Sequence, residues 1–184
     1  MPNLDAAYGL RPTRHLTGGC LRTNKYTIAS AHPVNIFTGD PVELVAAGVI
    51  QESAAGSNTS IGVFWGCKYV YGAGNQVFSK HWPANTVATE IEAFVYDDPD
   101  VIWQVQGNAT GLTAADVGGL ADWVVVAGDT SVGRSKSVIS NVVGATGGLR
   151  ILRLVEDGEN ESGAFTDVEV VMAEHAFNTT GGGV

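Results

Sequence analysis

Two pairs of carboxylates have a spacing that a sugar-cleaving or calcium-binding site could use. Asp98 and Asp100 flank Pro99 in an expected turn, and Glu90 and Glu92 share one face of an expected strand. Either pair could present two oxygens to a sugar or to Ca²⁺. An Asp-rich turn more commonly uses its side chains to accept hydrogen bonds from nearby backbone amides, and we favour that interpretation.

Five aromatic side chains could form a surface on which sugar rings stack. Large aromatics are more commonly part of a core or an interface, and we favour that interpretation here. The five residues are Trp65, Tyr69, Tyr71, Trp82 and Trp103.

Motifs for catalysis or cofactor binding are absent from the sequence. It contains no phosphate-binding loop, no dinucleotide-binding glycine motif, no nucleophile elbow and no HExxH. The four histidines lie far apart, and none has a second ligand at metal-binding spacing. We therefore expect no enzyme activity, no cofactor and no metal. The histidines are His15, His32, His81 and His175.

The opening residues indicate the compartment in which the protein is made, and that compartment determines the expected state of the two cysteines. The first fifteen residues lack the apolar core of a signal peptide, and no apolar stretch approaches the roughly 20 residues of a membrane helix. We expect a protein that is made in a cytoplasm and does not enter a membrane. Cys20 and Cys67 are then expected to be free thiols, although a pairing between them stays open.

Charge is scarce and unevenly distributed. Of 184 residues only 16% are charged, against about 25% in an average soluble domain, and the net charge is −9. This balance argues against binding to nucleic acid, which depends on Lys and Arg. The first thirty residues carry four cations against Asp5, an excess of +3, and no basic residue lies between Lys80 and Arg134. The pattern fits a basic arm that reaches onto an acidic neighbour, or four ordinary solvated cations.

Short runs rich in Val, Ile, Tyr, Trp, Phe and Thr recur between turn residues, and helical periodicity is nearly absent. This pattern predicts an all-β protein, an antiparallel β-sandwich that resembles a jelly roll, with one helical turn within residues 113–120. The expected strands are 25–29, 35–37, 41–46, 60–71, 76–81, 89–96, 101–106, 122–126, 136–139, 149–155 and 168–176.

Three segments follow from this pattern. Residues 1–24 are broken by Pro and Gly and contain isolated large side chains, so we expect an extended N-terminal arm that docks on a partner. Residues 25–177 form the β-sandwich domain. Residues 178–184 are expected to be a flexible C-terminal tail.

Six sequence segments, which occur in the same order as in the family, resemble tailed-bacteriophage head proteins, a family that includes capsid decoration, or cement, proteins. The segments are AAYGLRPTRHLTGG (6–19), FTGDPVEL (37–44), IGVFWGCKY (61–69), AFVYDDPDVIWQVQ (93–106), GLTAADV (111–117) and LRILRLVEDGENESGAFTDVEVVMAEHAF (149–177).

The resemblance implies a structural virion protein on the outer surface of the head, made in the cytoplasm of a host bacterium. Its implied partners are the major capsid protein, whose subunits it would bridge, and further copies of itself, as a dimer or trimer at a symmetry axis. From the family only the opening segment is transferred, as the capsid-contacting arm. The arm residues are Leu4, Tyr8, Leu10, Arg11 and Arg14.

Two other functions stay open at this point. One is a carbohydrate-binding or glycan-hydrolysing β-sandwich that uses the aromatic and carboxylate clusters. The other is a different virion part, such as a tail or fibre module.

Overall fold

The computed structural model describes residues 3–54 and 60–177, and that part of the chain is built from antiparallel β-strands. The predicted all-β, antiparallel, sandwich-like fold is confirmed, while the jelly-roll strand order stays a prediction. The predicted tail at 178–184 lies outside the described residues. The predicted helical turn is present as a 3₁₀ turn, η1 (Ala114–Asp116), with Thr113 as its N-cap.

The strands have the following bounds. They are β1 (Arg11–His15), β2 (Asn24–Tyr26), β3 (Ile36–Phe37), β4 (Pro41–Leu44), β5 (Ile50–Glu52), β6 (Ser60–Tyr71), β7 (Asn75–Ser79), β8 (His81–Trp82), β9 (Ala88–Tyr96), β10 (Val101–Gln106), β11 (Leu120–Ala121), β12 (Trp123–Val124), β13 (Val138–Ile139), β14 (Leu149–Leu154) and β15 (Asp167–Met172).

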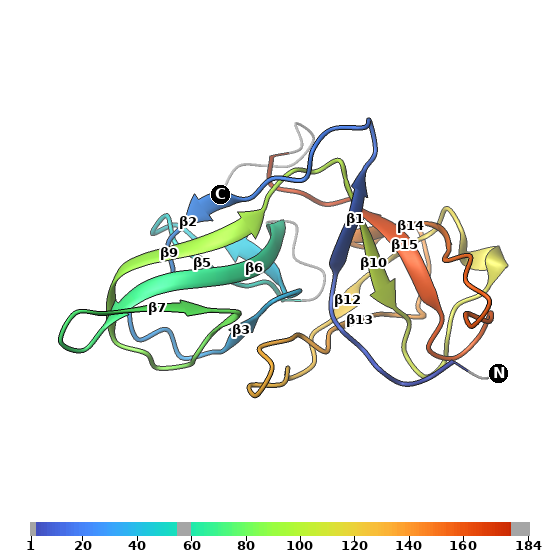
Figure 1. Ribbon diagram of the computed structural model, residues 1–184. Helices are drawn as coiled ribbons and strands as arrows, with labels where there is room; N and C mark the ends of the chain where they lie inside the picture. The colour runs from blue at the N-terminus through green and yellow to red at the C-terminus, as the bar shows by residue number, and fades with distance from the viewer. Residues whose placement is uncertain (1–2, 55–59, 178–184) are drawn as a thin grey trace.

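These strands form two lobes that lie side by side (Figure 1). The six-stranded lobe contains the sheet β2-β9-β6-β4-β5, with β7 paired to β6, and the small β3–β8 pair. The five-stranded lobe contains the sheet β1-β10-β15-β14-β11 and the small β12–β13 pair. The first lobe is therefore built from one continuous stretch, residues 24–96, whereas the second joins β10 to β15 with a strand from the N-terminus.

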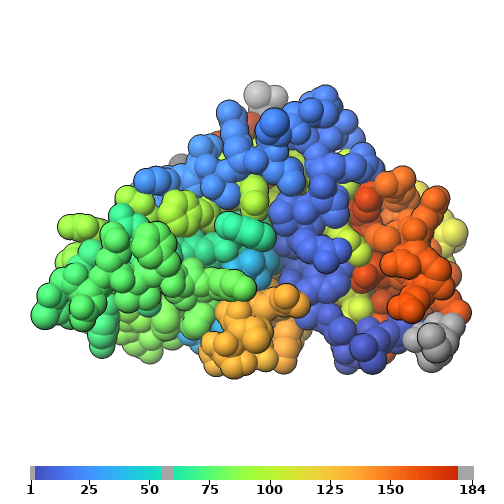
Figure 2. Space-filling view, in the orientation of Figure 1, coloured from blue at the N-terminus to red at the C-terminus, as the bar shows by residue number. Residues whose placement is uncertain are grey.

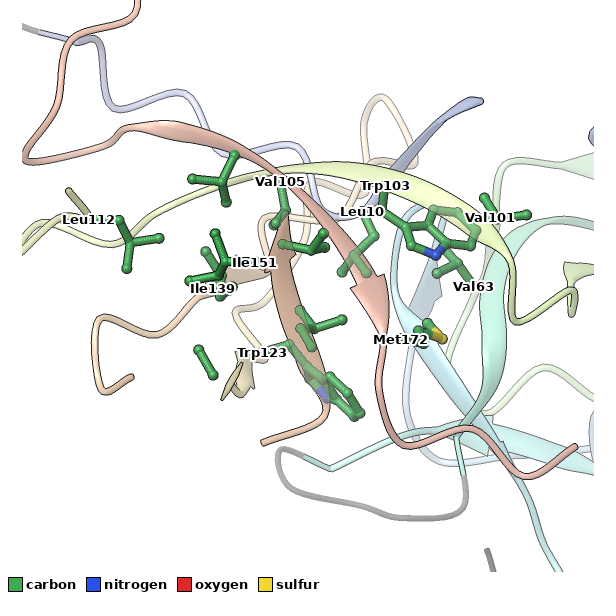
Figure 3. Close-up of a cluster of buried hydrophobic side chains, with 14 residues drawn as sticks. Leu10, Val63, Val101, Trp103, Val105, Leu112, Trp123, Ile139, Ile151 and Met172 are labelled. Carbon is green, nitrogen blue, oxygen red and sulfur yellow. The ribbon is translucent and has the colours of Figure 1, made fainter. Parts of the chain in front are cut away.

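Each lobe has its own cluster of buried apolar side chains. Phe64 and Trp82 are fully buried in the cluster of the six-stranded lobe. Trp103 and Trp123 are fully buried in the cluster of the five-stranded lobe, which Figure 3 shows. Val63 of β6 belongs to this second cluster, so the long strand β6 contributes to both cores.

The N-terminal segment is not an arm outside the domain. Residues 11–15 form β1, which pairs with β10 and is the end strand of the five-stranded sheet. Leu10 is only 1% exposed and belongs to the same core cluster as Trp103 (Figure 3). The predicted boundary after residue 24 therefore separates β1 and Leu10 from the lobe to which they belong, although Leu4 and Leu16 of the same segment are 78% and 53% exposed.

Candidate binding cavity

The aromatic residues that could have formed a sugar-stacking surface do not lie on one surface. Trp82 and Trp103 are fully buried and Tyr69 is 6% exposed, whereas Trp65 and Tyr71 are 46% and 54% exposed. Trp82 and Tyr69 pack against each other, edge to face, in the core of the six-stranded lobe. Three of the five residues are thus core aromatics, as we favoured from the sequence.

One carboxylate of each pair is engaged by neighbours within the chain. Glu92 lies 2.9 Å from the Lys25 ammonium and 3.8 Å from that of Lys68. Asp98 accepts a hydrogen bond from the backbone N–H of Asp100 at 3.0 Å, which is the turn interpretation of this motif.

One group of three metal-ligand types lies close together in the described residues: His15, Asp98 and Asp100. The Nδ1 atom of His15 lies 3.2 Å from the Thr17 backbone N–H and accepts its hydrogen. The proton of the neutral ring is then on Nε2, which lies 3.1 Å from the Asp98 carboxylate and donates to it. Both ring nitrogens are used, so this group ties β1 to the turn before β10.

The five residues assigned to the arm have different surroundings. Leu10 is in the core, and the Arg14 guanidinium lies 2.8 Å from the Glu169 carboxylate, which also pairs with Arg153. Leu4 is 78% exposed. Tyr8, Leu10 and Arg11 line a surface cavity that is larger than the one described further below. The arm prediction is therefore wrong for Leu10, whose side chain is inaccessible, and Arg14 already has a partner within the chain.

This larger cavity has a volume of about 490 Å³ and lies at the junction of the two lobes. Four parts of the chain form its walls: the N-terminal segment, the turn after β3, strand β6 with the residue after β7, and the loop at residues 132–134. Figure 2 shows the N-terminal segment in blue and this loop in gold, close together on one face of the molecule. The principal side chains are Tyr8, Arg11, Trp65, Lys80, Val132 and Arg134.

Thr38 holds these walls together. Its hydroxyl lies 2.7 Å from the carbonyl oxygen of Trp65 and 2.6 Å from that of Lys80. Its backbone N–H points to the carbonyls of Lys80 and Gly133 at 3.0 and 3.2 Å, and its own carbonyl accepts from the Ser135 N–H at 3.0 Å. The turn after β3, strand β6 with Lys80, and the loop at residues 132–134 are thereby fixed relative to one another.

Two glycines allow the N-terminal segment to lie against this turn. A Cβ on Gly9 would be 2.6 Å from the Ser135 Cβ, and a Cβ on Gly39 would be 3.0 Å from the Tyr8 carbonyl oxygen. Both have positive φ, which L side chains rarely adopt. The close approach lets the Leu10 N–H donate to the Gly39 carbonyl at 2.9 Å, and this contact places Tyr8 and Arg11 in the cavity wall.

The cavity is cationic. Three of the ten basic residues line it, namely Arg11, Lys80 and Arg134, and its lining among the described residues contains no carboxylate. The Arg11 guanidinium lies over the Tyr8 ring, 5.2 Å from its centroid, and hydrogen-bonds to Gln104. Within the described chain, neither Lys80 nor Arg134 has an ion pair.

A second cavity of about 290 Å³ lies on the other side of Tyr8 and has the opposite character. Its lining includes the carboxylates of Asp157, Glu159 and Asp167 and no Lys or Arg. Burial, followed by the charge of Asp167, raises the pKa of Tyr8, so its hydroxyl stays neutral. Tyr8 therefore separates a cationic cavity from an acidic one.

Sequence reasoning identified Tyr8 and Arg11 but missed the other walls. The one signal was the charge gap between Lys80 and Arg134, because the two cations that end it meet in this cavity. The two thiols are free, Cys20 exposed and Cys67 buried, and burial raises the pKa of Cys67 to about 12.

Comparisons with protein families, with curated proteins and with solved structures find no match to this chain. In the described residues there is no helix with the length and apolar character needed to cross a membrane.

Proposed function

We propose that the protein is a capsid decoration protein of a tailed bacteriophage, which binds the outer surface of the head and bridges major capsid protein subunits. The family resemblance of the six sequence segments motivates the proposal. The observation that carries it is the face around the cationic cavity, where exposed apolar side chains lie beside cations that have no acidic partner in the described chain.

The apolar part of this face follows the hairpin β6–β7 and the neighbouring loop. Trp65 is 46%, Phe78 72% and Val132 55% exposed. Single exposed apolar residues are ordinary, but a group of them next to a cavity is typical of a surface that another protein covers. A decoration protein needs such a surface because it is held on a shell by many moderate contacts that act together.

In this proposal the capsid contact is made by the folded face and not by a free arm. The protein would be made in the host cytoplasm and assemble on the outside of the head, as a dimer or trimer at a symmetry axis. Tyr8 and Arg11 keep a role as capsid contacts, whereas Leu10 supports them from the core.

The test is binding to purified heads of the virus that encodes the chain. A double variant, Trp65→Ala with Phe78→Ser, changes one half-exposed and one largely exposed side chain, and its unfolding midpoint is compared with that of wild type because Trp65 also packs on the Tyr96 ring. We expect it to lower occupancy on heads by at least about tenfold, or 1.4 kcal/mol. Val142→Ser is the matched control, because Val142 is 75% exposed and does not line the cavity. Deleting residues 1–14 is unsuitable, since it removes Leu10 from the core.

Cryo-electron microscopy of the decorated particles gives the second readout. Density on the outer head surface is the expected result. If the wild-type protein were found on the tail or a fibre, the proposal of a head protein would be wrong, and equal occupancy for all three proteins would contradict the assignment of this face.

A further inference from the structure

We infer that the cationic cavity is a binding site for a short acidic segment of a partner polypeptide, whose carboxylates meet Arg11, Lys80 and Arg134 and whose neighbouring apolar side chain packs on Trp65 and Val132. The inference deepens the proposed function, because it names the chemistry of the partner. It rests on the proposed function only where it identifies that partner as a capsid protein.

The charge distribution argues for an anionic ligand. Three cations line one cavity in a protein whose net charge is −9, and no carboxylate among the described lining residues compensates them. Like charges that share a cavity repel one another, and a cavity wall of low dielectric strengthens their field. By contrast, the nearby Arg14 and Arg153 share Glu169 at 2.8 and 2.9 Å. A bound anion would neutralise the cavity cations in the way that Glu169 neutralises Arg14 and Arg153.

The neighbouring surface limits how long that anion can be. The acidic cavity on the other side of Tyr8 would present Asp157, Glu159 and Asp167 to a ligand that extends beyond the cationic cavity. A continuous polyanion such as a nucleic acid strand would meet these carboxylates, whereas a short segment with one or two acidic side chains would not. The volume of about 490 Å³ is also at the lower end of the range for binding pockets, enough for a few side chains.

The rest of the lining argues for a polypeptide rather than a free inorganic anion. Trp65 and Val132 present roughly half of their surfaces to solvent at the cavity, and the Tyr8 ring lies under the Arg11 guanidinium. Such a site suits a ligand that has an apolar side chain next to its carboxylate. The walls are fixed in advance by the hydrogen bonds of Thr38 and by that of the Leu10 N–H to the Gly39 carbonyl, so little ordering is needed on binding.

The experiment titrates the full-length, ¹⁵N-labelled protein with acetyl-Glu-Phe-Glu-Leu-Glu-amide. Trp65 supplies the readout, because the other three tryptophans are fully buried and its indole N–H signal reports on the cavity. We expect saturable shifts of this signal that weaken as salt is raised from 50 to 500 mM. The matched peptide with Gln in place of Glu should bind at least about tenfold more weakly.

The variant Arg134→Glu should bind the acidic peptide about tenfold more weakly than wild type, or weaker still. Lys136→Glu is its matched control, since Lys136 lies on the same loop and is exposed but does not line the cavity, and it should stay within about twofold of wild type. Equal loss in both variants would overturn the site, because it would reflect only the net charge of the protein.

Three other results would also overturn the inference. They are no shift with either peptide, saturation by inorganic phosphate without any response to the acidic peptide, and self-association that Arg134→Glu abolishes while the peptide stays unbound, which would assign the cavity to a second copy. Peptide binding without binding to heads would leave the cavity site standing and contradict the proposed function. Binding to heads without peptide binding would support the proposed function and overturn the cavity site.

Discussion

The two lobes are built from similar strands but differ in how far apart in sequence their parts are. The six-stranded lobe uses residues 24–96 in one stretch, so that even its widest pairing, β2 with β9, lies within that stretch. The five-stranded lobe is completed by β1, which pairs with β10 across an interval of about 90 residues. A polar, Pro-containing segment that resembled a detached arm is therefore the end strand of the second lobe, and Leu10 is part of its core.

This difference determines which residues of the N-terminal segment a partner can reach. The N-terminal segment uses Leu10 and Arg14 to hold the five-stranded lobe together, and Tyr8 and Arg11 flank Leu10 in the cavity wall. The contacts that a partner can reach are consequently set where the two lobes meet, by Thr38 and the segments it joins.

The largest effect should come from Leu10→Ala. Removing this buried side chain is expected to lower the free energy of unfolding by about 2–5 kcal/mol. Hydrogen exchange should show the loss in the five-stranded lobe, while β6 and β9 keep most of their protection. Leu4→Ala is the control, because Leu4 is 78% exposed and should change nothing measurable. An equal loss in both lobes would show that they unfold as one unit.

Asp40→Ala should have the next largest effect, because Asp40 is fully buried and joins the lobes. Its carboxylate accepts from the Phe37 N–H at 2.7 Å and from the Ser137 hydroxyl at 3.2 Å. Loss of a buried acceptor with two donors should cost about 2–3 kcal/mol in urea unfolding. Burial raises the pKa of Asp40, so the neutral Asp40→Asn variant should lose less. A larger loss for Asn than for Ala would contradict this account.

Two glutamates, one in each lobe, should respond to pH in opposite directions. Burial, then the charge of Asp40, raises the pKa of Glu52 from 4.5 to about 7. Burial also acts to raise the pKa of Glu169, but Arg153 and Arg14 outweigh it and the pKa is lowered overall. Glu52 therefore costs stability as pH rises from 4.5 to about 7, and Glu169 adds stability that is lost as pH falls below 4.5.

Glu52→Gln should accordingly stabilise the protein at pH 8 and change little at pH 4. Glu169→Gln should destabilise it at pH 7, by about 1–2 kcal/mol after allowance for the half-exposed arginines, and change little near pH 3. Urea unfolding across this pH range measures both variants. The same direction of change in the two pH profiles would contradict the assigned shifts.

The smallest effect should come from Lys25→Ala in the six-stranded lobe. Its ammonium lies 2.9 Å from Glu92, but the Lys25 side chain is 64% exposed. We expect a loss below about 1 kcal/mol, and still less at 1 M salt. Thermal unfolding at low and high salt measures it, and a loss above 2 kcal/mol would mean that this exposed pair contributes as much as the buried contacts.

Much of the strand pattern could be predicted because several strands are long apolar runs between turn residues. The bounds of β6 and β10 agree with the prediction, and the alternation of β9 places Ala93 and Val95 inward. Strand β5 was missed because Ile50 is its one apolar residue, followed by Gln51 and Glu52. The predicted strand at 122–126 is instead the two-residue β12, and Val124 and Val126 are about 40% exposed rather than covered on both faces.

The cavity could not be predicted, because it joins residues from 8 to 134 and depends on which segments meet. Local alternation shows which side of a strand is apolar, but it carries no information about the partner strand. For that reason RPTRH was interpreted as exposed arm, although its neighbour Leu10 lies in the core. Lys80 and Arg134 could be singled out by the charge gap, yet only pairing across the lobes brings them together.

The place of β1 also imposes an order of events during synthesis. The ribosome releases β1 before its partner β10, which follows about 90 residues later, when every strand of the other lobe has already been made. Until then β1 has both edges free, and closing so long a loop is slow. Strand β1 is thus made before its partner and can pair only afterwards, and the cavity that it borders can form only after the loop at residues 132–134 has been made.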